Sequence, residues 1–117
     1  MYQLVFYVPE THLESVKQAI FAVGGGLYQG YDQCCWQVAG QGQFRPLSGS
    51  NPFLGEMGQR HTVDEYKVEL VCSAENIIAV TQALIESHPY EQPAYQIIPF
   101  LSLNDLNSLL LSPATNS

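Results

Sequence analysis

The apolar residues at the start of the chain follow first a strand pattern and then a helix pattern. Residues 2–8 are β-branched and aromatic and end at Pro9, which cannot donate a hydrogen bond to a neighbouring strand. Thr11 and Glu14 have the spacing of a capping box, and apolar side chains then recur at helical spacing up to the three glycines at 24–26. The sequence therefore predicts a strand followed by a helix.

A second apolar run and a long irregular segment come next. The run covers residues 33–38, and the Gly40-Gln41-Gly42 stretch after it predicts a turn into residues 43–45, so we interpret this part as a hairpin. Residues 45–62 contain too many prolines and glycines for a regular element and are long for a loop in a compact domain. Loops of this length are usually functional or cover another part of the protein.

Residues 63–73 alternate cleanly between apolar and charged side chains, which predicts a strand with one face in the core. The apolar face holds Tyr66, Val68, Leu70 and Cys72. The other face holds Glu65, Lys67 and Glu69. A charged face of this kind most often contacts solvent, but in a ring of subunits it could form ion pairs between copies.

A second helix, a final strand and a tail complete the chain. Ser73 is placed to cap a helix that ends before Pro89, since the residue preceding a proline avoids the helical region. Residues 94–101 predict a strand that is apolar on both faces, which suits cover by helices on one side and by a neighbouring chain on the other. The leucines of residues 102–117 predict one short helix, packed on the body or on a partner, before a polar end.

This order of elements is that of an α+β, ferredoxin-like βαββαβ sandwich. Right-handed crossovers place both helices on one face of an antiparallel sheet. A chain of 117 residues suits one hydrophobic core, so we expect a single domain over residues 1–101 and a short leucine-containing tail over residues 102–117.

The composition limits the partners of this domain. Four Lys and Arg residues against eleven Asp and Glu residues give a net charge of -7, which repels nucleic acid and anionic lipid, so we expect neither as a partner. The apolar share is 46% and the charged share 13%, which suggests that another subunit covers part of the apolar surface. We find neither an apolar stretch of membrane-spanning length nor a basic start typical of a signal peptide, and we expect a cytoplasmic location.

Three stretches of the sequence resemble a known group of proteins. Residues 88–95, HPYEQPAY, lie between the second helix and the last strand and resemble the closing motif of CutA and PII-like oligomeric domains. Residues 40–46, GQGQFRP, and 50–55, SNPFLG, resemble the domain inserted into the YqfO-type members of the Nif-three-like (NGG-one-interacting-factor) proteins. The motif or interface residues are Gly40, Gly42, Phe44, Pro46, Pro52, Gly55, Pro89, Tyr90, Pro93 and Tyr95.

The resemblance extends over nearly the whole chain up to about residue 101. It implies a ferredoxin-like fold that assembles as a homo-oligomeric ring, with a trimer favoured over a dimer and the sheets facing inward. It does not imply an enzyme, because the hydrolase-like chemistry of the larger family is attributed to a two-metal site in a flanking domain. We expect the present domain to stand alone without that site.

His88, Glu91 and His61 are the candidate ligands of a divalent metal ion. An imidazole and a carboxylate close together are the usual start of such a site. In the structural alternative, His88 binds the carbonyl groups at the helix end while Pro89 fixes the turn and Tyr90 packs. The sequence favours this alternative, because no HxH, HExxH or CxxC spacing reinforces the metal site.

The cysteines offer a weaker candidate site. Cys34, Cys35 and Cys72 together with His61 could bind a soft metal ion. Adjacent cysteines in a strand point to opposite faces, however, so free thiols that behave as small apolar side chains are the favoured interpretation. A Cys-His nucleophile pair has no supporting signature in the sequence.

The glycines between residues 40 and 58 could bind an anion through backbone N–H groups, with charge added by Arg45 and Arg60. Neither GxxxxGK[ST] nor GxGxxG is present, and turn formation explains these glycines better.

Three functions remain open at this point. We favour an oligomeric PII/CutA-like binding or regulatory module that holds a small ligand or a divalent metal in a cleft between subunits, near the 45–62 loop. The first alternative is a domain that docks on a separate protein. The second, less favoured, is a metal-dependent enzyme that uses His88, Glu91 and His61.

Overall fold

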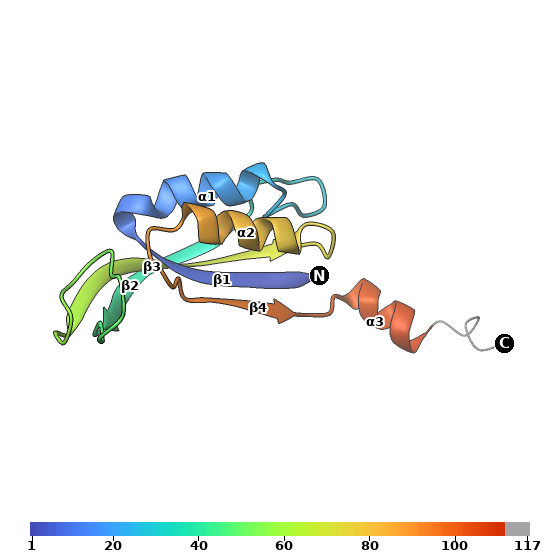
Figure 1. Cartoon of the computed structure of the whole chain (residues 1–117). Helices are drawn as coiled ribbons and strands as arrows, with labels where there is room; N and C mark the ends of the chain where they lie inside the picture. Colours follow the sequence, from blue (N-terminus) through green and yellow to red (C-terminus); the bar gives the residue numbers. More distant parts are fainter. Residues whose placement is uncertain (112–117) are drawn as a thin grey trace.

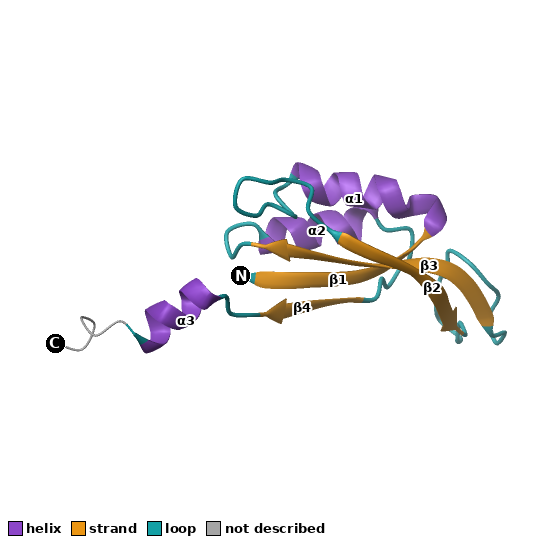
Figure 2. Ribbon diagram, turned by 180° about the vertical axis from the view of Figure 1, so that it is seen from behind, coloured by secondary structure: helices purple, strands orange, loops and turns teal. Residues whose placement is uncertain are grey.

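The computed structural model describes residues 1–111, in which a four-stranded antiparallel sheet carries two helices on one face (Figure 1; Figure 2). Residues 112–117 of the predicted tail lie outside the described residues. The strands are β1 (Tyr2–Pro9), β2 (Trp36–Phe44), β3 (His61–Cys72) and β4 (Tyr95–Pro99), in the sheet order β2-β3-β1-β4. The helices are α1 (Leu13–Ala22), preceded by the 3₁₀ turn η1 (Glu10–His12), α2 (Ile77–Ser87) and α3 (Leu103–Leu110). The predicted ferredoxin-like α+β fold is confirmed.

The core lies between the two central strands and the helices α1 and α2. On β3 the predicted alternation is correct, because Val68, Leu70 and Cys72 are buried and Tyr66 packs against the same cluster. The cluster also takes alternate residues of β1 and one stripe from each helix. These further members are Leu4, Phe6, Val8, Leu13, Val16, Ile20, Ile77, Val80 and Leu84.

The predicted turn at Gly40-Gln41-Gly42 is wrong. Strand β2 runs through these residues, which pair with Glu65, Asp64 and Val63 of β3. The β2–β3 hairpin closes only after Phe44, through the segment 45–60. Glycines weaken a strand and favour a turn, but here pairing with the long partner strand β3 keeps these residues extended.

Both predicted helix caps are also wrong. Residue Thr11 lies in η1, its Oγ1 bonds to His12 Nδ1 at 2.9 Å, and α1 begins at Leu13 without a side-chain cap. Helix α2 begins at Ile77, after a turn in which the Asn76 N–H donates to the Ser73 carbonyl. Local backbone turns therefore satisfy the amide groups that side chains were expected to bind.

The sheet is open at its β4 end. Residues Tyr95–Pro99 form an edge strand of which every residue is exposed, so the predicted cover by helices is incomplete there. Beyond β4, α3 projects away from the sheet (Figure 1; Figure 2). Its presence agrees with the predicted short helix of the tail. Within residues 1–111, no helix has both the length and the apolar character needed to cross a lipid bilayer.

Candidate functional site

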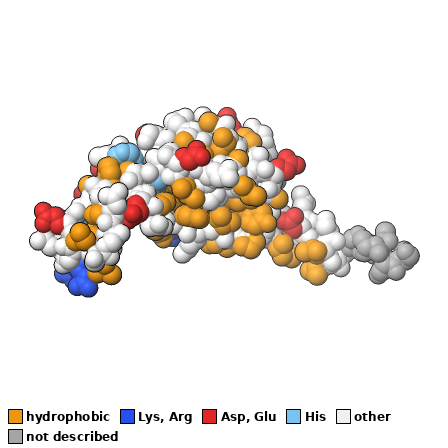
Figure 3. Space-filling view, in the orientation of Figure 1, with side chains coloured by type: hydrophobic (Ala, Val, Ile, Leu, Met, Phe, Trp, Pro, Cys, Tyr) orange, Lys and Arg blue, Asp and Glu red, His pale blue; other side chains and the backbone are white. Residues whose placement is uncertain are grey.

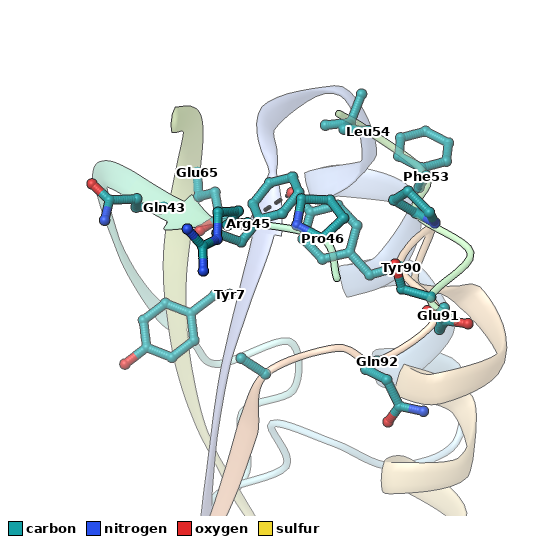
Figure 4. A pocket seen from close by; sticks show the side chains of 15 residues that line it. Tyr7, Gln43, Arg45, Pro46, Phe53, Leu54, Glu65, Tyr90, Glu91 and Gln92 are labelled. Carbon is teal, nitrogen blue, oxygen red and sulfur yellow. Dashed lines mark hydrogen bonds between the residues drawn. The ribbon is translucent and has the colours of Figure 1, made fainter. Parts of the chain in front are cut away.

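Four parts of the chain that are far apart in the sequence meet beside the β2–β3 hairpin and surround a cavity of about 310 Å³. They are Tyr7 of β1, the end of β2 with the segment after it, Glu65 of β3, and the segment that follows α2 (Figure 4). The motif residues that line the cavity are Gly42, Phe44, Pro46, Pro52 and Tyr90. The structure therefore brings together residues from all three motifs of the sequence.

Aromatic rings form much of the cavity wall, with Tyr90 at their centre. The Tyr90 ring centroid lies 6.3 Å from that of Phe44 and 6.2 Å from that of Phe53. On its other side Tyr90 is 4.9 Å from the ring of His88. Phe44 in turn stacks on His61 with 5.9 Å between centroids and 24° between planes. Such tilted and offset pairs are favourable aromatic geometries and hold the wall in place.

A carboxylate lies in this aromatic wall. The Tyr90 hydroxyl donates a hydrogen bond to Glu65 Oε2 at 3.1 Å. Burial raises the pKa of Glu65, while the hydrogen bond from Tyr90 lowers it. Burial and the neighbouring Glu65 charge raise the pKa of Tyr90, so the phenol keeps its proton. The second oxygen, Oε1, lies against Gly42 and accepts no hydrogen bond from residues 1–111.

The carboxylate of Glu65 reaches this position because Gly42 has no side chain. A Cβ atom at Gly42 would lie 2.6 Å from the Glu65 carboxyl carbon, which is closer than real contacts allow. At Gly40, two residues earlier on the same strand, an added Cβ atom would meet no atom within 4 Å. Of the two glycines in β2, only Gly42 is therefore needed for the cavity.

His88 fixes the segment after α2 to strand β1. Its ring is buried, with 7% of the residue surface exposed. Nε2 donates to the Tyr7 carbonyl at 2.7 Å, and Nδ1 accepts from the Tyr90 N–H at 3.1 Å. The two bonds require a neutral imidazole with its proton on Nε2. The prediction that the ring binds the carbonyls of α2 is wrong, because a strand carbonyl lies closer to it.

This geometry predicts that acid destabilises the protein through His88. Burial lowers the pKa of His88 below its usual value, and His12 lowers it further, whereas the bond to Tyr7 acts in the opposite direction. The unfolded chain therefore binds a proton more readily, and the stabilisation from neutral His88 is lost as the pH falls from about 6.5 through the native pKa. We expect the His88 Hε1 resonance to titrate below about pH 6.5 in an NMR experiment. A titration above that value would contradict a neutral, doubly bonded ring.

The structure does not bring His88, Glu91 and His61 together as metal ligands. Both ring nitrogens of His88 are engaged, and Glu91 Oε1 accepts from the Asn51 N–H at 2.9 Å. His61 Nε2 accepts from the Glu56 N–H at 3.1 Å. Among residues 1–111 no group of three or more His, Cys, Asp and Glu side chains is arranged to hold a metal ion. Glu91 and His61 instead fasten the 45–60 segment to the body.

The cysteines do not form a common site either. Cys72 is in the core, where burial raises the pKa of its thiol. Cys34 and Cys35 are half-buried and precede β2, so the prediction that they lie in a strand is wrong. Cys35 packs against the core cluster, whereas the thiol of Cys34 faces the Asp32 carbonyl at 3.7 Å. This agrees with the interpretation of the cysteines as free thiols.

Of the remaining candidates, only Arg45 lines the cavity, and it is exposed there. Gly55 has a φ angle of 87° and lies against the ring of His61, so it shapes the loop. Gly40, Arg60, Pro89, Pro93 and Tyr95 do not line the cavity.

Sequence reasoning missed the part played by Glu65. Its alternation with core residues predicted a solvent-facing or intersubunit charge, and this fits Lys67 and Glu69, which form a half-exposed pair at 3.5 Å. Glu65 itself is half-buried beneath Tyr90 and lines the cavity. Tyr90 in the HPYEQP stretch is the signal in the sequence for a polar contact at this site, but the sequence does not indicate that Glu65 is its partner.

Comparison with known proteins agrees with this fold. No family model matches the chain. It is 39% identical over 99 residues to a GTP cyclohydrolase 1 type 2 homolog of Halalkalibacterium halodurans, a match that covers 85% of this chain and 27% of that protein. The chain thus spans about a quarter of the length of the curated relatives it matches.

Two solved structures complete the comparison. A Bacillus cereus protein related to NIF3 matches with a TM-score of 0.74 and 32% identity, over 86% of this chain and 26% of that one. CutA of Pyrococcus horikoshii matches with a TM-score of 0.64 over 95% and 96% of the two chains; at 15% identity this shows the fold alone. The chain is homologous to the CutA- and PII-like domain inserted in the NIF3-related GTP cyclohydrolase 1 type 2 homologs, as its motifs indicated.

Proposed function

We propose that this chain is an oligomeric binding module and that its cavity holds a small organic ligand. The observation that carries the proposal is the convergence of three separate motifs on one aromatic cavity with an available carboxylate oxygen. Concave, mostly apolar sites with a few polar groups are the usual form of a ligand pocket. The cavity lies within a single chain, whereas the predicted cleft between subunits would need a neighbour beside it.

The lining favours a flat ring that carries an N–H donor. Phe44, Phe53 and Tyr90 offer ring faces and edges to such a molecule. Glu65 Oε1 can accept a hydrogen bond from the ligand while Oε2 stays bonded to Tyr90. Arg45, exposed at the cavity, can bind an acidic or polar substituent that points outward.

The open face of the sheet supports assembly. Trp36, Val38 and Ile98 pair with Glu69, Lys67 and Gln3, which places them on the face opposite the helices. These three apolar side chains are 61%, 43% and 41% exposed. Apolar surface of this kind is typical of a subunit interface. We propose a homo-oligomer with this face inward, and the resemblance to ring-forming domains favours three copies.

A matched pair of small molecules tests the pocket. We expect 2-aminopyridine, a flat ring with an N–H donor, to shift the NMR resonances of residues around Phe44, Phe53 and Tyr90. The bond to a charged carboxylate is worth about 1.5–3 kcal/mol, so 2-methylpyridine, which lacks the donor, should bind at least about tenfold more weakly. The variant Glu65→Gln should remove most of this difference.

Native mass spectrometry of the same samples reports the number of copies and the bound probe together. A monomer that binds neither probe would contradict both parts of the proposal. Resonance shifts that are equal for the two probes, or that lie away from the cavity, would contradict the assigned role of Glu65.

The length of the relatives favours a second candidate function. In them the homologous segment is about a quarter of a longer chain, where it lies beside other parts of the same protein. A domain that docks on a separate protein would use the same exposed apolar faces. Native mass spectrometry separates the two functions, because a docking domain would be a monomer without the probe. The relatives are named for an activity of the whole protein, and this chain matches only about a quarter of their length.

A further inference from the structure

We infer that α3 of one copy docks into the groove between α2 and β4 of a second copy. This contact lies at the opposite end of the domain from the cavity and does not depend on the proposed ligand. It also lies on the helix-bearing side of the sheet, so it is separate from the open face.

Helix α3 is amphipathic and presents its apolar side to solvent. Leu103, Leu106 and Leu110 follow helical spacing, and with Leu109 they form one apolar stripe. Leu103, Leu109 and Leu110 are 73%, 68% and 74% exposed. A helix of eight residues is marginal on its own in water, even with the capping box that Ser102 and Asp105 provide. The stripe therefore requires a surface to pack on.

The same chain carries an open apolar groove of about 320 Å³. Its walls are the outer face of α2 and the helix-facing side of the edge strand β4. Ile78 is 70% exposed on α2 and Ile97 is 39% exposed on β4. The groove is lined by Tyr2, Ile77, Ile78, Thr81, Gln82 and Ile97. Figure 3 shows hydrophobic side chains gathered below α2 and along β4, and again on α3.

The direction of α3 favours the groove of another copy. The Phe100 N–H donates to the Met1 carbonyl at 3.1 Å, so strand pairing continues almost to the helix. Ser102 is extended, and α3 then projects away from the sheet and from α2 (Figure 1; Figure 2). Because α3 points away from α2 and β4 of its own chain, the groove of a neighbouring copy is easier for it to reach than its own.

The chain exposes more surface than a compact monomer of the same mass does. The chain exposes 7776 Å², whereas a compact monomer of 13.0 kDa exposes about 6,300 Å². The excess of about 1,400 Å² belongs to the chain as a whole, with α3 and the groove as part of it, and it exceeds the roughly 800 Å² that each partner contributes to a standard interface.

The chemistry of the two surfaces points to self-association. Neither the groove nor α3 carries a Lys or Arg residue, and the one acidic group of α3, Asp105, is bound in the capping box. Each copy of the chain carries one groove and one α3, so the two surfaces are present in equal number. Both are apolar and uncharged, which makes them chemically compatible. A charged partner protein would find no complementary group on either.

Sedimentation equilibrium of the full chain tests the contact. We expect Leu106→Asp, in the centre of the stripe, to weaken self-association at least about tenfold, because a carboxylate cannot enter an apolar groove. Ser108→Asp adds the same charge to the side of α3 opposite the stripe, where Ser108 is exposed, and should change the association constant less than about twofold. Since α3 lies outside the core, both variants should keep the wild-type circular dichroism spectrum. Equal association of the two variants would overturn the inference.

Disulfide trapping identifies the groove. Two differently tagged chains, one with Leu106→Cys and one with Ile78→Cys, are expressed together and oxidised mildly. We expect a linked dimer that contains one chain of each kind and requires both new cysteines. Far less of it should form when Ser108→Cys, on the opposite side of α3, replaces Leu106→Cys. A single chain that carries both Leu106→Cys and Ile78→Cys is oxidised in parallel. If this chain forms an internal disulfide and the mixed dimer is absent, then α3 packs on its own chain and the inference is overturned.

Discussion

Replacing His88 with alanine is expected to lower the free energy of unfolding by about 2–4 kcal/mol. The substitution removes the donor to the Tyr7 carbonyl and the acceptor of the Tyr90 N–H, which then lack partners in a buried position. It also leaves a void beside the ring of Tyr90. Urea denaturation followed by circular dichroism measures the change.

A neighbouring substitution provides the control for His88. Glu86→Ala removes an exposed side chain from the last turn of α2, two residues before His88, and should change the free energy of unfolding by less than about 0.5 kcal/mol. A small effect of His88→Ala on stability, together with the loss of a bound divalent metal, would contradict the structural role. It would instead restore the metal site that the sequence suggested.

The fold was predictable because its strongest signals are local. The alternation of β3 around Val68 and Leu70 defines a strand with one buried face, and the glycines at 24–26 end α1 clearly. The hairpin was misplaced because Gly40 and Gly42 are compatible with a turn, and only the pairing with β3 excludes one. The helix caps failed for a similar reason, since several local groups compete for the same amide groups.

The candidate site was only partly predictable. The motifs identified Phe44, Pro52 and Tyr90 as important, but they could not reveal that these residues enclose Glu65. That contact depends on the register of β2 against β3, which tertiary packing decides. The partner of His88 is equally remote, because the Tyr7 carbonyl lies 81 residues earlier in the sequence. Residue type alone therefore left a metal ligand as one alternative, where the fold uses His88 as a hydrogen-bonded link.

The two glycines of β2 offer a direct test of the cavity. We expect Gly42→Ala to be less stable than Gly40→Ala by about 1–2 kcal/mol, because the new methyl group displaces the Glu65 carboxylate and breaks its bond with Tyr90. Gly40→Ala meets open space and should be neutral or stabilising by up to about 1 kcal/mol, since alanine restricts the unfolded chain. Chemical denaturation of both variants measures the difference.

Binding of 2-aminopyridine should separate the two variants even further. With the carboxylate displaced, Gly42→Ala should bind the probe at least about tenfold more weakly than the wild type, which corresponds to the loss of one charge-assisted hydrogen bond. Gly40→Ala should bind it with unchanged affinity, because Gly40 does not line the cavity. The two substitutions make the same chemical change on one strand, two residues apart, so general strand propensity cannot explain a difference between them. Equal stability and equal binding would mean that the position of Glu65 under Tyr90 does not shape the pocket.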